Sequence, residues 1–245
     1  SRSGAEEAEW ALRCDMAAVF RVSARFGWNE QIGNHNSLML PGERPLFMIN
    51  PRGMMFRELT ASSLIICDLD GTVVRGSGEL RKVAFHIHAR IHMLNPNAVC
   101  VLHVHPRYLT ALSMIEGGRL ELSHHNNLRL NDRIVYDDGG YEPVDDDAEG
   151  DRIAKLMGDK TIMVMGSHGV TVVGGNVHDA FGECCTAEST AMYQMTARTL
   201  KRPLSVLPET GRVGHLGPWG KIPDSRMLLD AWRRVLDKEE PDYAT

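Results

Sequence analysis

Apolar residues recur with a broadly helical period in several long segments of the chain. In the first segment, Trp10, Met16, Val19 and Val22 follow this period, and Gly27 is a suitable C-terminal stop. In the second, the Asn95-Pro96 pair ends the pattern because the residue before proline disfavours helix. The segments predicted to be helical are residues 5–27, 79–94, 108–115, 177–200 and 226–236.

Shorter apolar runs between these helices have the lengths and flanking residues of β-strands. The predicted strands lie within residues 34–42, 46–51, 64–74, 98–105 and 161–174. Within 64–74, Asp70-Gly71 is a strong hairpin signal, and a helical turn is expected near Thr60, a capable N-cap. The alternation predicts an α/β fold with a mostly antiparallel sheet and helices packed against it.

The composition sets the class of protein. The chain has 245 residues, of which 43% are hydrophobic and 24% charged, with a formal net charge of -5 and no basic patch typical of nucleic-acid binding. No apolar run reaches the roughly 20 residues that span a bilayer, and the N-terminus lacks the pattern of a secretory signal. We therefore expect a soluble, cytoplasmic protein with no membrane or nucleic-acid partner, whose five cysteines are reduced and structural.

No linker divides the chain, so one domain is expected over residues 1–245. Its core should span about residues 10–200, and a Gly/Pro-rich loop over 211–225 should lead to the last helix.

Two histidines lie two residues apart in the apolar stretch "VLHVHP". On a strand, His103 and His105 point to the same face, while Val104 points into the core on the other. Two imidazoles at this spacing are able to bind one cation. The alternative is a hydrogen-bonded pair at a sheet edge.

A third histidine, His168, follows a predicted strand and lies between Gly166 and the adjacent Gly169. Glycines allow a sharp turn and close approach of the backbone to a ligand. Three neutral imidazoles suit Zn, Mn, Fe or Co and leave positions open for a substrate. The alternative is that His168 is an ordinary turn residue.

The separated motifs "GNHNSLML", "INPRGMMFRELTASSLIICDLDGTVV", "FHIHARIHMLNPNAVCVLHVHP", "RIVYDDGG" and "MGSHGVTVVGGNVHDAF" together closely resemble the class II aldolase/adducin family. The resemblance runs in order from about residue 10 to about residue 200. It implies a three-layer α/β/α fold with a central, mostly antiparallel sheet, commonly in a cyclic homotetramer with active sites at subunit interfaces. It also implies that His103, His105 and His168 hold one divalent metal ion, a Lewis acid that chelates substrate oxygens and stabilises an enolate.

The sequence departs from the sugar-phosphate aldolases of that family. These carry a carboxylate ahead of the helix that leads to the His-x-His strand. Counting back without gaps places that position at Ala84, and Glu79 would reach the site only through a different loop. Where the aldolases bind phosphate with small residues, this chain has Arg52 and Gly53, followed later by Arg81 and Lys82. Guanidinium groups suit a planar carboxylate as well as phosphate, so a carboxylate substrate is expected.

Family members without the acidic residue include metal-dependent decarboxylases of aromatic or hydroxy acids and a few iron-dependent oxygenases. Loss of carbon dioxide itself generates the carbanion, so a decarboxylase needs an electron sink and a proton donor but no initial base. The sequence thus favours a metal-dependent lyase that decarboxylates an aromatic or hydroxy/keto acid. The alternatives are an aldolase acting on a small hydroxy-carbonyl compound, a non-heme iron(II) oxygenase, and a non-catalytic adducin-like module, although adducin lacks the metal histidines.

The remaining candidates are assigned by the same resemblance. His125 or His124 is the expected proton donor, in a loop or strand that lines the pocket of a neighbouring subunit, and Arg52 is the expected contact for an anionic group. Asn34, His35, Gly53 and His88 are the expected substrate contacts, although a structural role is equally open for His88 and its neighbours His86 and His92. Tyr136 is expected to be structural, and residues 23–30 carry no pattern that predicts chemistry.

Overall fold

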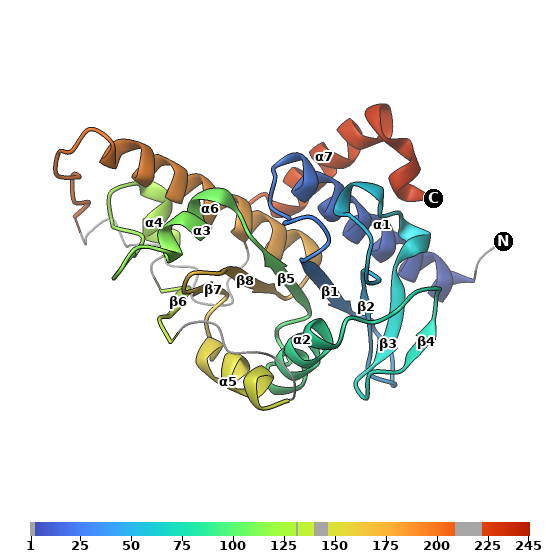
Figure 1. The fold of residues 1–245 in the computed structure, drawn as a ribbon. Helices are drawn as coiled ribbons and strands as arrows, with labels where there is room; N and C mark the ends of the chain where they lie inside the picture. Colours follow the sequence, from blue (N-terminus) through green and yellow to red (C-terminus); the bar gives the residue numbers. More distant parts are fainter. Residues whose placement is uncertain (1–2, 131, 140–146, 209–221) are drawn as a thin grey trace.

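The computed structural model describes residues 3–130, 132–139, 147–208 and 222–245, and these form an eight-stranded sheet with helices on both faces (Figure 1). The helices are α1 (Gly4–Arg25), α2 (Lys82–Leu94), α3 (Arg107–Ser113), α4 (His125–Leu130), α5 (Asp147–Met157), α6 (Val177–Arg198) and α7 (Ser225–Glu239). The strands are β1 (His35–Met39), β2 (Leu46–Ile49), β3 (Ile65–Asp68), β4 (Val73–Arg75), β5 (Cys100–Val104), β6 (Ile134–Asp137), β7 (Ile162–Met165) and β8 (Gly169–Gly174).

The strands lie in the order β4-β3-β2-β1-β5-β8-β7-β6. Neighbouring strands run antiparallel except β6 and β7, which are parallel. The prediction of a mostly antiparallel sheet is confirmed. In the middle of the sheet, His103 of β5 lies opposite His35 of β1 on one side and Thr171 of β8 on the other.

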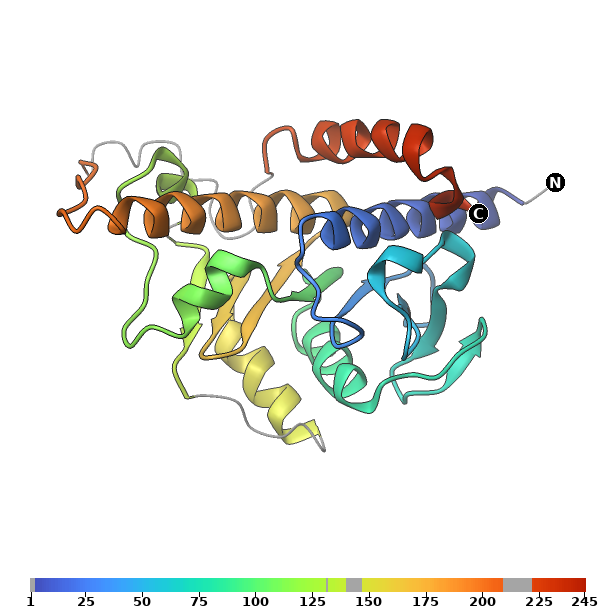
Figure 2. The ribbon, with the colours of Figure 1, turned by 45° about the horizontal axis from the view of Figure 1, so that its top comes forward.

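Helices cover both faces of this sheet, as the three-layer prediction requires. In Figure 2, α1, α6 and α7 run above the sheet, while α2 and α5 lie below it and pack on each other. Ile87 and Ile91 of α2 join Ile153 and Met157 of α5 in an apolar cluster that also contains Val101 of β5. Because both faces of the central strands are buried, their side chains pack on both sides, and the polar residues among them, such as His35, Ser37 and His103, are buried as well.

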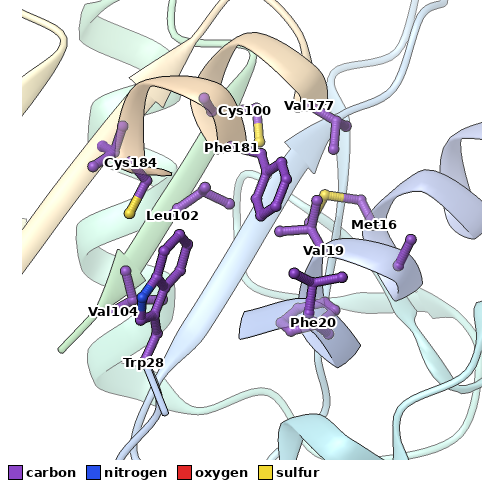
Figure 3. Close-up of a cluster of buried hydrophobic side chains, with 14 of the residues drawn as sticks. Met16, Val19, Phe20, Trp28, Cys100, Leu102, Val104, Val177, Phe181 and Cys184 are labelled. Carbon is purple, nitrogen blue, oxygen red and sulfur yellow. The ribbon is translucent and has the colours of Figure 1, made fainter. Parts of the chain in front are cut away.

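The larger apolar cluster lies between the sheet and α1 and α6 (Figure 3). Leu102 and Val104 of β5 pack there with Trp28 and Phe181, and all four are at most 3% exposed. The strand period of two therefore turns the intervening His103 toward the opposite face. That face carries the candidate site.

Most predicted elements agree with the structure. All five predicted helices form, the hairpin at Asp70-Gly71 joins β3 to β4, and a short 3₁₀ turn at Ala61–Ser63 follows the predicted cap Thr60. His125 was expected in a loop or strand, and this is wrong, because it begins helix α4. The predicted loop over 211–225 lies largely outside the described residues. Among the helices that the structure describes, none combines the length and apolar character required to cross a membrane.

Candidate metal centre

His103 is held near the middle of the sheet by β5. Its ring is 3% exposed, and its Nδ1 lies 3.1 Å from the carbonyl oxygen of Val170 on β8. A carbonyl only accepts, so in the neutral ring Nδ1 carries the proton and Nε2 keeps its lone pair. This is the arrangement in which a second hydrogen bond orients a metal-binding imidazole.

His105 lies one residue beyond the end of β5, where its backbone N–H donates to the carbonyl of Trp28. Its Nδ1 donates to Glu30 Oε2 at 2.6 Å. Its Nε2 is buried and has no hydrogen-bond partner among the described residues. An orphaned buried imidazole nitrogen is costly unless it binds something, so Nε2 fits the role of a metal ligand.

His168 lies in the turn between β7 and β8, where Ser167 adopts a left-handed conformation with φ of 52°. Gly169, the residue after His168, packs directly beneath the ring of His105. A Cβ atom at position 169 would lie 2.4 Å from Cδ2 of His105 and 2.9 Å from the carbonyl oxygen of Val104. The absence of a side chain at Gly169 thus allows the turn to lie against the end of β5.

The three rings converge as the sequence predicts. One ligand nitrogen from each of His103, His105 and His168 lies within 4.8 Å of the other two. Burial and the neighbouring imidazoles lower the pKa of His103 well below its usual value and that of His168 to about 4. The rings of His103 and His168 are therefore neutral near pH 7, the state in which imidazole binds a metal ion. The donor set fits Zn, Mn or Fe.

The trio opens into a cavity of about 570 Å³ whose other walls include His35, Arg81, Val83 and Ile87. A second cavity of about 1100 Å³ shares Glu30, Gly33, Arg81 and Val83 with the first and is also lined by Arg52 and Lys82. Arg52 is 3.7 Å from Glu79, and both side chains are largely exposed. Arg81 thus lines both cavities, whereas Arg52 lines only the second.

Ala84, the position reached by counting back from the strand, lies within α2. It is 1% exposed and packs in an apolar cluster with Phe47, Ile49 and Ile65. It lines neither cavity, so a carboxylate at position 84 would point into the core beneath α2. The start of α2 faces the cavities through Arg81 and Val83 instead.

His35 lines the cavity and stacks on His103, with ring centroids 4.8 Å apart. His88 lies behind it and is fully buried, so its contribution to the site is indirect. His88 Nε2 is 2.7 Å from His35 Nδ1, and Ser37 links His88 to His92. His86 instead pairs with Asp147 at the surface of α2.

Asn34 and Gly53 are the two remaining residues that the sequence proposes as substrate contacts. Asn34 accepts a hydrogen bond from the backbone N–H of Glu30 at 2.6 Å, which shapes the loop that carries Glu30. Gly53 has φ of 88°, a conformation that favours glycine, and it lines neither cavity.

His124 and His125 line neither of these two cavities. Their rings lie 4.4 Å apart, and His124 also packs on Tyr193 of α6. Tyr136 accepts a hydrogen bond from the N–H of Leu120 and lies under Arg119, as expected of a structural residue.

Glu30 is the residue of the site that the sequence does not reveal. It lies in the irregular segment between α1 and β1, in a stretch without a pattern that predicts chemistry. The clue that the sequence offers is that a carboxylate, Glu30, lies shortly before the motif "GNHNS".

Comparison with known proteins agrees with this architecture. The sequence model of the family described as class II aldolase and adducin N-terminal domain matches residues 14–195. A Caulobacter vibrioides protein with a provisional class 2 aldolase name is 32% identical over 243 residues, which cover 97% of this chain and 93% of that protein. Alpha-adducin of Mus musculus is 34% identical over 180 residues, which cover 72% of this chain and 24% of adducin.

Solved structures share the fold over nearly the whole chain. An aldolase II superfamily protein from Pseudomonas syringae has a TM-score of 0.88 at 29% identity, covering 97% of this chain and 96% of that one. An L-fuculose 1-phosphate aldolase from Glaciozyma antarctica has a TM-score of 0.83 at 21% identity, and the match covers 99% of this chain and 95% of that one. This chain therefore belongs to the class II aldolase and adducin N-terminal domain family.

Proposed function

We propose that this chain is a divalent-metal-dependent carbon–carbon lyase that decarboxylates an aromatic or hydroxy/keto carboxylic acid. The observation that carries the proposal is the convergence of three imidazoles on a cavity that Arg81 also lines. Cation-binding nitrogens and a guanidinium in one cavity suit an anionic, oxygen-rich substrate.

His103, His105 and His168 would hold the metal ion. When bound, a divalent ion supplies Lewis-acid chemistry, in which it draws electron density from substrate oxygens during cleavage of the carbon–carbon bond. Glu30 and the Val170 carbonyl hold the rings of His105 and His103 in the ligand orientation. Among the described residues, the group of converging ligands contains no carboxylate, and Glu30 is engaged by His105.

Arg81, which lines both cavities, would bind the anionic group of the substrate, and Arg52 would support it from the second cavity. Val83 and Ile87 supply an apolar wall that limits water around the reacting carbon. His125 or His124 would donate the proton from a neighbouring subunit of a homotetramer, since neither reaches the cavity of its own chain.

Aldol cleavage of a small hydroxy-carbonyl compound is the second candidate. It is favoured by the class 2 aldolase name of the Caulobacter relative. A decarboxylase has the simpler requirement, because loss of carbon dioxide needs no protein base, and the described site offers no unengaged carboxylate for one.

The test combines metal content with turnover. We expect one divalent ion per chain in the purified protein, and a loss of at least about a hundredfold in metal affinity in His103→Ala and His168→Ala. His178→Ala, on α6, is the matched control. Folded ligand variants with full metal content would refute the metal site.

Turnover of hydroxy, keto and aromatic acids is then measured anaerobically with Mn or Zn. Release of carbon dioxide supports the decarboxylase, whereas aldehyde release from hydroxy-carbonyl compounds identifies the aldolase. Turnover that depends strictly on iron and oxygen would replace the lyase proposal with an oxygenase, and metal binding without any turnover would favour an adducin-like module.

A further inference from the structure

A row of buried polar groups extends from the cavity into the layer beneath α2. His35 and Ser37 are two residues apart on β1, while His88 and His92 are four apart on α2, so each pair presents one face to the other. Their exposed fractions are 4% for His35, 0% for Ser37 and His88, and 6% for His92. The contacts run from His35 Nδ1 to His88 Nε2 at 2.7 Å, from His88 Nδ1 to Ser37 Oγ, and from Ser37 Oγ to His92 Nε2 at 2.7 Å.

The far end of the row sets the direction of its hydrogen bonds. His92 Nδ1 lies 2.7 Å from the carbonyl oxygen of Ala98, which only accepts, so this nitrogen carries a proton. Burial lowers the pKa of His92 to about 4, and its ring is neutral. Its Nε2 is therefore an acceptor, and the single hydroxyl proton of Ser37 points toward it.

The protonated nitrogens of the other residues in the row are assigned by the same reasoning. With its proton directed at His92, Ser37 accepts from His88, so Nδ1 of His88 is protonated. His88 is fully buried and neutral, which leaves its Nε2 to accept from Nδ1 of His35. His35 then has an unprotonated Nε2, and this atom makes no hydrogen bond to any residue in the described part of the chain.

We propose that the buried row Ala98, His92, Ser37 and His88 fixes His35 in the tautomer whose Nε2 accepts a hydrogen bond from a hydroxyl group of the substrate. Of the acids considered above, this selects an acid that carries a hydroxyl group beside a carbonyl or an aromatic ring, which takes the electron pair left by carbon dioxide. A keto acid without a hydroxyl has no proton to donate to His35, and it would leave a polar atom in the cavity unpaired. His35 is a substrate-specificity residue, and His88, Ser37 and His92 are positioning residues.

This inference rests on the proposed function for its substrate class, but the tautomer is testable without metal or turnover. In metal-free protein labelled with ¹⁵N-histidine, long-range ¹H–¹⁵N spectra identify which ring nitrogen is protonated. The His35 signals are assigned by their loss in His35→Gln. We expect protonation at Nδ1 alone, movement of the His35 signals toward a mixture of tautomers in Ser37→Ala, and restoration in Ser37→Thr.

Ser23→Ala is the matched control, because Ser23 is a fully buried serine on α1 whose hydroxyl lies outside the row. It should leave His35 unchanged. A wild-type His35 protonated at Nε2, or spectra unchanged by Ser37→Ala, would overturn the proposal. If Ser37→Ala does not fold, the wild-type tautomer alone decides the question.

The substrate class is tested with glycolate and methoxyacetate binding to cobalt(II)-loaded protein. Both acids offer a carboxylate and an adjacent oxygen, but only glycolate has a hydroxyl proton to donate. The ratio of their affinities should fall by about five- to tenfold in Ser37→Ala, the range of one hydrogen bond, and return in Ser37→Thr. An unchanged ratio would refute the role of His35. Failure of cobalt to bind would instead refute the metal site while leaving the tautomer result intact.

Discussion

Glu30 and His105 are joined by a 2.6 Å hydrogen bond, although they come from segments 75 residues apart. The carboxylate lies in the loop after α1, and the imidazole lies just past the end of β5. Their contact leaves Nε2 of His105 directed away from Glu30, toward the other two histidines. The loop after the first helix thus orients a residue just past the end of a central strand.

Replacing Glu30 by glutamine removes the charge but keeps a hydrogen-bond acceptor of similar size. We expect the affinity for zinc to fall about 10- to 100-fold, because a carboxylate partner increases the basicity of a ligating imidazole. Competition with a chelator measures the change. Gln31→Ala, which alters an adjacent cavity residue without touching His105, should retain the wild-type affinity. Equal affinities in wild type and Glu30→Gln would show that the contact is incidental.

Adding one methyl group at Gly169 should displace His105. The new Cβ would lie 2.4 Å from the ring, so the turn or the ring has to move. We expect Gly169→Ala to fold but to bind metal at least tenfold more weakly, since ligand positions tolerate little displacement. Gly175→Ala is the control, because a Cβ at that position meets nothing within 4 Å. Isothermal titration with zinc compares the two variants, and identical affinities would contradict the expected displacement.

The two arginines should contribute unequally to turnover. Arg81 lines both cavities, whereas Arg52 lines only the outer one. We expect Arg81→Ala to lower kcat/KM for an acidic substrate by about a hundredfold, corresponding to about 2 to 3 kcal/mol for a charge-assisted contact. Arg52→Ala should have a smaller effect. Steady-state kinetics test the order, and a larger loss in Arg52→Ala would place the anionic group in the outer cavity.

A glutamate at position 84 should damage the fold, without adding a base to the site. Ala84 is packed against Phe47, Ile49 and Ile65, so a carboxylate there has no water and no partner. We expect Ala84→Glu to lose roughly 3 kcal/mol or more of unfolding free energy. Val83→Glu places the same group on the cavity side of α2 and should cost less. Urea denaturation of the two variants distinguishes the positions, and an equally stable Ala84→Glu protein would show that this side chain is able to turn outward.

Acid should destabilise the fold through His92. Burial lowers its folded-state pKa from 6.5 to about 4, so the unfolded chain takes up a proton more readily than the folded one. The free energy of unfolding should therefore fall as the pH falls from about 6.5 to about 4, with His92 contributing on the order of 3 kcal/mol. His92→Gln should be less stable at pH 7 but lose less stability over this range. Parallel pH curves for the two proteins would exclude His92 as a cause.

The sequence predicts the elements well where the pattern is local. His103 and His105 follow the two-residue period of a strand, and Gly166 and Gly169 mark the turn that holds His168. The sheet and its covering helices follow from the same periodicities, and the match to the family model over residues 14–195 agrees with the resemblance.

What the sequence does not reveal depends on contacts between distant segments. Ser37 meets His92 across 55 positions, and no local pattern indicates that pairing. Ala84 packs in the core because of the face of α2 on which it lies, and counting back along the sequence does not indicate that face. His125 begins a short helix of six residues, a length at which periodicity is too weak to recognise.

The five residues of β5 are all buried and are bonded to strands on both sides. Amide protons in such a central strand exchange with solvent only when most of the molecule opens, whereas those of a surface loop exchange through small local fluctuations. We therefore expect the amide of His103 to be among the slowest to exchange and the loop that carries Glu30 to exchange more readily. The metal-binding trio thus combines a residue of the stable central strand with one that a surface loop orients. Local opening of the loop that carries Glu30 would break its hydrogen bond to His105, while His103 would stay in place.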